Sequence, residues 1–335
     1  MALSTEATVR FAVSLILSVV GTLGNVCALV VVTKSPALRK RSNAFLVNLS
    51  FVDFLVTAVV MPMFLAQTYY QSWPSTYGSC QAFTYLFIAC PGNSFLTALL
   101  FTLYCYVKIT KSSVLFERLF SGYKVLVYLL CIWICSITFT ILAELISAKI
   151  KYVDVYMYCF YEPHDHKSWV YFAVFSGIGG IVILAVPLAY NHIYRSVRCA
   201  RQRIHAAPPA DQQNTTQHGP CSRSVHSKEE LRITKVALLV SCEVIITCLP
   251  GCINLMLQQA IPAAVPAWRY ISILLLVKSA INRYLYGWIN KHYMNAYRKV
   301  FAPCFRNSQP SENSDCVDNI NNRSNDKVSE TKQSS

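Results

Sequence analysis

Seven apolar segments, each long enough to cross a lipid bilayer, occupy most of the first 290 or so residues. A hydrocarbon core of roughly 30 Å requires about 20 helical residues to span it. The segments are Val9–Val32, Ala44–Gln67, Gln81–Val107, Tyr123–Ile146, Ser168–Tyr194, Ile233–Gln258 and Ala267–Trp288. This pattern predicts an all-α membrane protein, a bundle of seven transmembrane helices.

The composition supports this fold class and limits the partners. Hydrophobic residues make up 54% of the chain and charged residues only 14%. A water-soluble domain of this composition would aggregate, so we expect the lipid bilayer to surround the chain. The net charge of +14 could suggest a nucleic-acid partner. The basic residues, however, flank the apolar segments instead of forming one patch, so no nucleic acid is expected.

The basic residues gather in alternate loops, which predicts the orientation in the membrane. Three loops, after the first segment, between the third and fourth, and between the fifth and sixth, contain Lys34, Arg39, Lys40, Arg41, Lys108, Lys111, Arg118, Lys124, Arg195, Arg198, Arg201, Arg203, Arg223, Lys228, Arg232 and Lys235. The opposite loops contain few basic residues. We therefore expect a multi-pass protein of the plasma membrane with an extracellular N-terminus and a cytoplasmic C-terminus.

The expected organisation has four parts. Residues 1–8 form the extracellular N-terminus, 9–288 the bundle, 289–301 a short amphipathic eighth helix, and 302–335 a disordered cytoplasmic tail. Hydroxyl side chains in the tail could accept phosphate and recruit arrestin-like proteins. Cys304, just after the eighth helix, could carry a palmitoyl chain or remain a free thiol.

Ionisable side chains inside the apolar segments are costly and therefore need a partner or a role. Asp53 lies in the second segment, Glu243 in the sixth, and Lys278 and Arg283 in the seventh. Lys278 and Asn282 are four residues apart and share a helix face, with Ser279 beside them. Together with polar residues of the first three segments they could form one cluster at mid-depth, made of Asn25, Asp53, Ser94, Lys278, Ser279 and Asn282.

A set of landmarks in this order resembles the rhodopsin-like G-protein-coupled receptors. The landmarks are Asn25 after Gly24, the run Asn48-Leu-Ser-Phe-Val-Asp53, Cys80 with Cys159, Trp133, Tyr190, Pro250, and Asn282-Arg-Tyr-Leu-Tyr286-Gly leading to Asn290-Lys-His-Tyr293. The resemblance covers Arg10 to about Ala302. Within the family, the sequences at the ends of the third and seventh segments look most like those of the melatonin receptors and related invertebrate orphan receptors.

The resemblance implies a disulfide and a ligand pocket. Cys80 and Cys159 both lie on the expected oxidising face, and the family pairs cysteines at these positions. A small ligand would bind between the outer ends of the helices, where aromatic candidates are Phe83, Phe87, Tyr158, Phe160, Trp169, Phe172 and Trp268. Amine receptors have an aspartate at the position of Phe87, so a neutral or apolar ligand is expected.

The chain departs from the family where a heterotrimeric G protein would bind. The family's acidic residue, arginine and tyrosine at the end of the third helix are replaced by Tyr104, Cys105 and Tyr106. Cys248 replaces a tryptophan in the sixth helix, and Arg283 replaces a proline in the seventh. These departures indicate altered signalling. The candidate residues on this face are Tyr104, Cys105, Tyr106, Tyr190, Glu230, Arg283 and Tyr286.

The seventh-segment lysine has several possible uses. Lys278 could form an ion pair with Asp53. In the family the cluster around this aspartate resembles a sodium site, so the ammonium could replace the sodium ion here. It could instead extend to interfacial water. A retinal lysine would stand at Leu276, whose side chain points about 200° away from that of Lys278 around the helix. Arg283 could pair with Glu243 or reach water at the cytoplasmic end.

The sequence contains no motif for hydrolysis or phosphate binding, so an enzyme, a cofactor and a metal site are not expected. A receptor coupled to a G protein or arrestin is the favoured interpretation. The alternative is a receptor-like protein without G-protein output, acting as a scaffold, a ligand sink or a partner in a heteromer. A transporter or channel would predict internal repeats and broken helices, which the sequence lacks.

Overall fold

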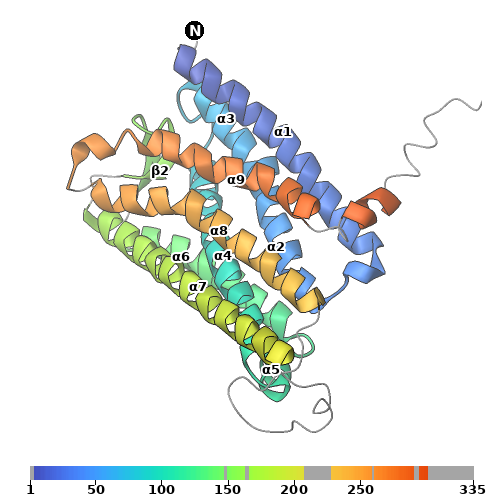
Figure 1. Ribbon diagram of the computed structural model, residues 1–335. Helices are drawn as coiled ribbons and strands as arrows, with labels where there is room; N and C mark the ends of the chain where they lie inside the picture. Colours follow the sequence, from blue (N-terminus) through green and yellow to red (C-terminus); the bar gives the residue numbers. More distant parts are fainter. Residues whose placement is uncertain are drawn as a thin grey trace, which may run out of the picture.

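A computed structural model describes residues 4–146, 149–162, 166–206, 228–258, 260–289 and 294–300 (Figure 1). In these residues seven helices are long and apolar enough to cross a membrane. They are α1 (Thr5–Lys34), the continuous series α2 (Arg41–Leu55), η2 (Val56–Val60) and α3 (Met61–Tyr70), then α4 (Tyr77–Thr110), α6 (Lys124–Leu145), α7 (His166–Ala206), α8 (Lys228–Leu257) and α9 (Trp268–Ile289). The predicted seven-helix bundle is confirmed.

Local sequence explains where the helices begin, end and change. At the start of α1 the Ser4 hydroxyl accepts a hydrogen bond from the Ala7 backbone N–H, and Glu6 lies in the first turn, where acidic groups are favourable. The second span contains one π-helical turn, η2, which begins three residues after Asp53. Such turns often occur at functional sites. The span ends at Gln71, whose φ is 53°.

The buried face of α1 consists largely of small and polar residues. Gly21 lies so close to its neighbours that an added Cβ would be 2.5 Å from Thr57 Cγ2 and 2.9 Å from Ala280 Cα. Small residues allow helices to approach closely in membranes. The first and last long helices, α1 and α9, therefore lie side by side (Figure 1).

A two-stranded antiparallel hairpin covers one end of the bundle, and the sequence did not predict it. Its strands are β1 (Ile150–Val153) and β2 (Tyr158–Tyr161), with Ile150 opposite Tyr161. The expected disulfide between Cys80 and Cys159 is present and joins β2 to the start of α4. We call this end of the bundle the hairpin end.

The opposite end carries the short helix α5 (Ser113–Phe120), and we call it the α5 end. The Ser112 hydroxyl caps α5, and Arg41 at the start of α2 forms an ion pair with Glu117 at 3.0 Å. Two connections are single 3₁₀ turns, η1 (Pro36–Leu38) and η3 (Pro262–Ala264). Residues 294–300 are helical, within the predicted eighth helix. Cys304 and the predicted tail, 302–335, lie outside the described residues.

Candidate functional site

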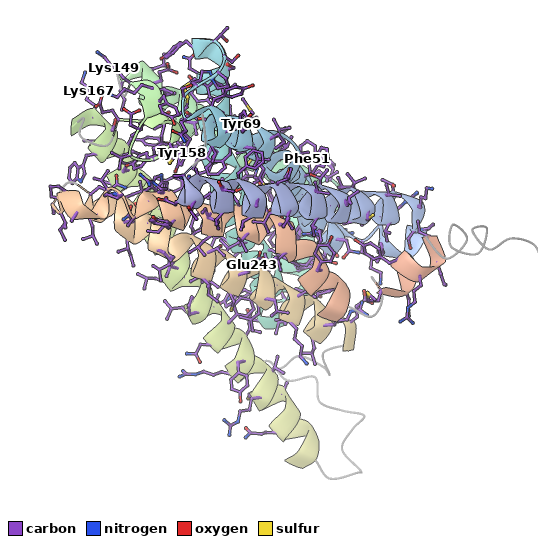
Figure 2. All side chains as sticks on the ribbon, turned by 90° about the horizontal axis from the view of Figure 1, so that it is seen from above. Phe51, Tyr69, Lys149, Tyr158, Lys167 and Glu243 are labelled. Atoms are coloured by element: carbon purple, nitrogen blue, oxygen red, sulfur yellow. A yellow bond between two sulfur atoms is a disulfide. The ribbon has the colours of Figure 1, made fainter. Side chains whose placement is uncertain are left out.

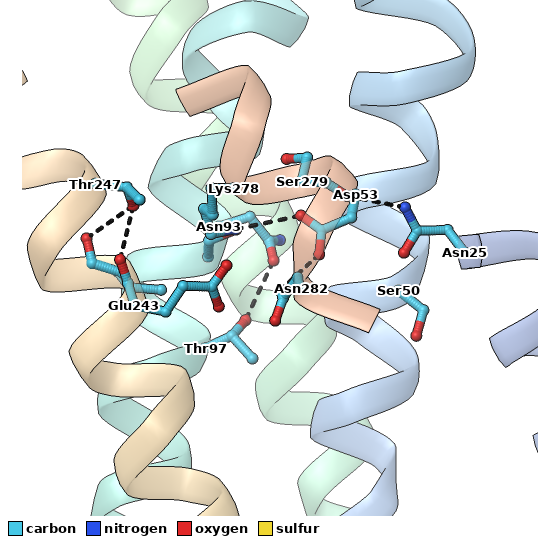
Figure 3. Close-up of polar contacts among 12 residues, drawn as sticks. Asn25, Ser50, Asp53, Asn93, Thr97, Glu243, Thr247, Lys278, Ser279 and Asn282 are labelled. Atoms are coloured by element: carbon cyan, nitrogen blue, oxygen red, sulfur yellow. Dashed lines mark hydrogen bonds and ion pairs between the residues drawn. The ribbon is translucent and has the colours of Figure 1, made fainter. Parts of the chain in front are cut away.

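The central polar cluster comes together between the second, third and seventh spans (Figure 3). The Lys278 ammonium lies 3.2 Å from Asp53 Oδ1 and donates to Ser94 Oγ at 3.0 Å. The Asn282 amide donates to the other carboxylate oxygen, Asp53 Oδ2, at 2.7 Å. The ion pair predicted from the sequence is therefore present, and Asn282 completes its hydrogen bonding.

Burial makes this ion pair energetically sensitive. The side chains of Lys278 and Asp53 are 4% and 0% exposed. Two charges removed from water repay their desolvation only when paired in good geometry, with further hydrogen bonds to the remaining atoms. Asn25 and Ser279 join the cluster differently: the Asn25 amide donates to the Ser279 backbone carbonyl at 3.1 Å, which ties α1 to α9.

A second polar network lies beside the cluster, and only two of its residues, Asn48 and Trp133, are among the sequence landmarks. The Asn48 amide donates to Asn93 Oδ1 at 2.8 Å and to Thr97 Oγ1 at 3.0 Å, and the Trp133 indole donates to Asn48 Oδ1 at 2.8 Å. Asn93 and Thr97 are four residues apart on α4, a spacing that could have identified them. Figure 3 shows the Glu243 carboxylate pointing from α8 towards the same interior.

A narrow aromatic cavity of about 30 Å³ lies among β2, α4, α7, α8 and α9. Four predicted pocket residues line it: Phe87, Phe160, Phe172 and Trp268. The sequence missed other lining residues, namely Ile88, Pro91, Phe95, Tyr171, Phe175, Cys248, Gly251, Cys252, Leu255 and Leu275. Binding sites for drug-sized ligands usually measure roughly 300–1,000 Å³. The protein's own rings therefore fill most of this space.

Three other predicted pocket residues do not line the cavity. Phe83 stacks on Phe87 with ring centroids 5.6 Å apart. Tyr158, which belongs to β2, packs against Phe87 with ring centroids 5.4 Å apart. Both are fully buried in the packed interior of the hairpin end. Trp169, near the start of α7, is half-buried and is not among the lining residues.

A second, smaller chamber lies between the aromatic cavity and the polar cluster. It measures about 10 Å³ and shares the wall residues Phe87, Pro91 and Leu275 with the first cavity. Its wall also includes Ser94, Lys278 and Ser279. Residues that line the aromatic cavity and Lys278 of the central ion pair therefore border the same chamber.

The α5 end places the predicted G-protein-face residues in different surroundings. Tyr104 and Cys105 are buried, at 3% and 2% exposure. Tyr104 packs among the rings of Phe45, Phe116 and Phe120. Tyr190 is also buried. A cavity of about 420 Å³ opens at this end. It lies among the start of α2, the start of α8 and residues 295–299.

The charged and aromatic residues nearby make specific contacts. The Glu230 carboxylate lies 4.0 Å from the ammonium of Lys108. Lys108 follows Cys105 by about one helical turn on α4. Tyr106 packs on the His192 ring at 5.4 Å. Arg283 donates to the Leu46 carbonyl at 3.3 Å, and its pairing with Glu243 stays a prediction. The side chain of Tyr286 lies outside the described residues.

Comparison with known proteins agrees with this arrangement. Residues 24–286 match the family described as 7 transmembrane receptor (rhodopsin family). The chain is 23% identical over 296 residues to melatonin receptor type 1A of Phodopus sungorus, covering 86% of this chain and 78% of that receptor. It is 25% identical over 323 residues to the neuropeptide F receptor of Drosophila melanogaster, covering 86% and 61%.

The fold is also similar to a solved structure. The crystal structure of squid rhodopsin aligns with a TM-score of 0.74 and 18% sequence identity, covering 100% of this chain and 95% of that one. The resemblance drawn from the sequence landmarks is thus confirmed, with melatonin receptors among the relatives. The chain belongs to the rhodopsin family of seven-transmembrane receptors.

Proposed function

We propose that this protein is a plasma-membrane receptor that binds a small, largely apolar ligand at the hairpin end and transmits a helix rearrangement to the α5 end. The observation that carries the proposal is that the aromatic cavity shares wall residues with a chamber that is also lined by Lys278 of the central ion pair. The disulfide at one end and the basic loops at the other favour an extracellular hairpin end and a cytoplasmic α5 end.

The lining of the cavity supports the ligand class. Phe87 and the other lining residues of the aromatic cavity include no carboxylate. A cationic amine would therefore lack a counter-charge there, whereas an apolar body would pack against the rings. Entry of such a ligand requires the rings to move, because the cavity is far smaller than a drug-sized molecule.

The cytoplasmic partner of this receptor would be a heterotrimeric G protein or an arrestin-like protein. One observation favours the alternative of a receptor-like protein without G-protein output. Cys105 stands where the family has an arginine, and it is buried. Its thiol is smaller than a guanidinium and lacks the charge. A scaffold, ligand sink or heteromer partner would not need that arginine.

A screen of small ligands with two outputs tests the proposal. Full-length protein in cells would be read for both G-protein activation and arrestin recruitment. A ligand that produces either output, and loses it when Phe87 is changed to Asp, supports a signalling receptor with this pocket. A ligand that binds without either output would favour the alternative, and a ligand unaffected by Phe87→Asp would contradict the proposed pocket.

A further inference from the structure

Arg10 is a buried cation that the apolar pattern of α1 does not reveal. It is only 3% exposed, although it lies in the second turn of the helix. Its guanidinium lies over the Phe64 ring at 5.4 Å, and Nη1 contacts the Met157 sulfur at 3.0 Å. A thioether is a weak acceptor, so this contact compensates little of the cost of burying a charge.

The other two nitrogens of Arg10 are available for a ligand. Nε and Nη2 are buried, and neither has a hydrogen-bond partner within the described part of the chain. These two nitrogens form one edge of the planar guanidinium. That edge presents two parallel N–H groups, the geometry that matches both oxygens of a carboxylate.

The acidic group near Arg10 is already used by another arginine. Glu6 lies one turn before Arg10 on α1, and its carboxylate pairs with Arg269 Nη1 at 3.0 Å. Arg269 also donates to the Val155 carbonyl in the hairpin at 3.0 and 2.9 Å. Two guanidinium groups thus lie beside the Glu6 carboxylate, and Asp154 of the hairpin lies near Tyr152, as both arginines do. The Nε and Nη2 atoms of Arg10 bind neither carboxylate.

Further buried donors surround the same place. Tyr158 OH, Trp268 Nε1 and Ser14 Oγ are buried, and among the residues the structure describes none of them makes a hydrogen bond of full geometry. The Tyr158 hydroxyl lies beside the Trp268 and Ser272 side chains, close enough for weak hydrogen bonds, and interacts electrostatically with Arg10. Ser14 follows Arg10 by four residues on the same buried face of α1. Figure 2 shows Tyr158 where the hairpin meets the starts of α1 and α9.

We propose that Arg10, Ser14, Tyr158 and Trp268, the Arg10 cluster, bind the carboxylate of a small organic acid. Arginine and the indole N–H can only donate, and both hydroxyls can donate, so donors outnumber acceptors in the cluster and none of its members carries negative charge. A carboxylate supplies both. Trp268 also lines the aromatic cavity, which places the apolar body of the acid beside it. This assignment rests on the proposed function and adds an acidic group to the apolar ligand.

The test measures thermal unfolding of the purified full-length protein in lipid nanodiscs. The probe is 3-phenylpropanoate, and its neutral amide, 3-phenylpropanamide, is the matched control compound. At tenfold its Kd, the acid is expected to raise the Tm by roughly 2 °C or more, and the amide by less than half as much. Equal shifts with both compounds, or no shift with either at millimolar concentration, would overturn the assignment.

Four variants locate the effect. Arg10→Gln removes the charge, and Arg10→Lys retains it without the planar edge; both are expected to abolish the acid-specific shift. The control is Lys151→Gln, which removes an exposed charge from the same hairpin, where Lys151 pairs with Glu162 at 2.7 Å. An acid-specific shift that survives in Arg10→Lys would contradict the assignment. If Arg10→Gln does not fold, Arg10→Lys and Trp268→Phe carry the test.

A structural role for Arg10 makes a different prediction from a binding role. Because its charge lacks a full counter-charge, Arg10→Gln is expected to leave the Tm without ligand unchanged or higher. A loss of more than about 5 °C would instead indicate that the contacts to Phe64 and Met157 stabilise the fold, and would overturn the assignment. In a further control, chloride replaces methanesulfonate at constant ionic strength. If chloride raises the Tm as much as the acid does, the assignment is also overturned.

Failure of this assignment and failure of the proposed function give separate results. If the acid binds at Arg10 without any G-protein or arrestin output, the assignment stands and the proposed function fails. If a signalling ligand is found whose response is unchanged in Arg10→Lys, the proposed function stands and the assignment fails.

Discussion

At the scale of single residues, the centre of the bundle is organised by a tethered cation. The Lys278 ammonium lies beside Asp53, where a free cation would bind, and Ser94 and Asn282 each add a hydrogen bond to the pair. A cation site requires uncompensated negative charge, which the ammonium removes. We therefore propose that Lys278 replaces bound sodium in this receptor.

The first prediction is that the two charges depend on each other. Changing Asp53 to Asn or Lys278 to Met alone should lower the free energy of unfolding by about 3–5 kcal/mol, because the other charge stays buried without its partner. The double variant should cost much less than the sum. Thermal or denaturant unfolding of all three variants measures this coupling. Additive losses would show that the two side chains act independently.

The second prediction is that sodium has no specific effect. The Tm of the purified protein should not change when sodium is exchanged for N-methyl-D-glucamine at constant ionic strength. Glu243 is the other carboxylate that points into this interior (Figure 3), so Glu243→Gln is the matched control for Asp53→Asn. A sodium-specific shift that disappears in Asp53→Asn and persists in Glu243→Gln would mean that the aspartate still holds an ion.

At the scale of elements, the contacts of α1 and the hairpin determine the shape of the hairpin end. Gly21 allows α1 to approach both the π-helical turn η2 and α9. The Cys159 backbone N–H donates to Gln67 Oε1 at 2.6 Å, and the Cys159 carbonyl accepts from Thr84 at 3.2 Å. The hairpin is thus attached to α3 and α4 by hydrogen bonds as well as by its disulfide.

The third prediction compares two glycines in helices. Gly21→Ala should lower stability by about 1–3 kcal/mol, because the new Cβ meets the Ala280 backbone and must separate two helices. Gly180→Ala in α7 is the control. Its Cβ would meet no atom within 4 Å, so alanine should stabilise by about 0.5–1 kcal/mol. Thermal unfolding measures both, and equal effects would contradict the close packing of α1.

The fourth prediction concerns the disulfide. Cys80→Ser or Cys159→Ser should reduce stability by about 2–5 kcal/mol and lower surface expression, because the bond closes a long loop of the chain. Cys131→Ser, which removes an exposed free thiol from α6, is the control and should have little effect. Flow cytometry of intact cells and thermal unfolding measure the two outcomes. Normal expression of Cys80→Ser would contradict a structural role for the bond.

Hydropathy predicted the seven spans because length and apolarity act over 20 or more residues. The same reasoning could not predict β1 and β2, since each strand has four residues and is held by the bundle beneath it. The pairing of Lys278 with Asp53 followed from helical spacing. Arg10 was missed because it stands near the end of a predicted span, although the four-residue spacing of Arg10, Ser14 and Ser18, each from the next, was a usable signal.

At the scale of the whole molecule, two apolar clusters lie towards the two ends of the bundle. They meet at the aromatic cavity, because Phe95, Cys248 and Cys252 of the α5-end cluster line it together with residues of the hairpin-end cluster. The α5-end cluster also buries Tyr104 and Cys105, with the charged contact of Lys108 and Glu230 one turn beyond that thiol.

The fifth prediction is that coupling to G proteins is weak. Cys105 cannot supply the planar cation that relatives direct towards the G protein. Nucleotide exchange on purified G proteins should stay near background, and Cys105→Arg should raise it if the rest of the apparatus works. Cys105→Ser, which removes the thiol without adding charge, is the control. Strong ligand-dependent exchange by the unmodified protein would contradict this expectation.

The contact between α1 and α9 has a consequence for how the protein is made. The ribosome releases α1 first and α9 last, yet the Asn25 amide binds the Ser279 carbonyl and the Tyr284 hydroxyl binds the Val20 carbonyl at 2.9 Å. The polar face of the first helix must therefore remain uncovered by α9 until almost the whole chain has been synthesised. In co-expressed halves, divided between α7 and α8, this non-covalent seam would form part of the interface, beside the contacts of α8 with α4 and α7.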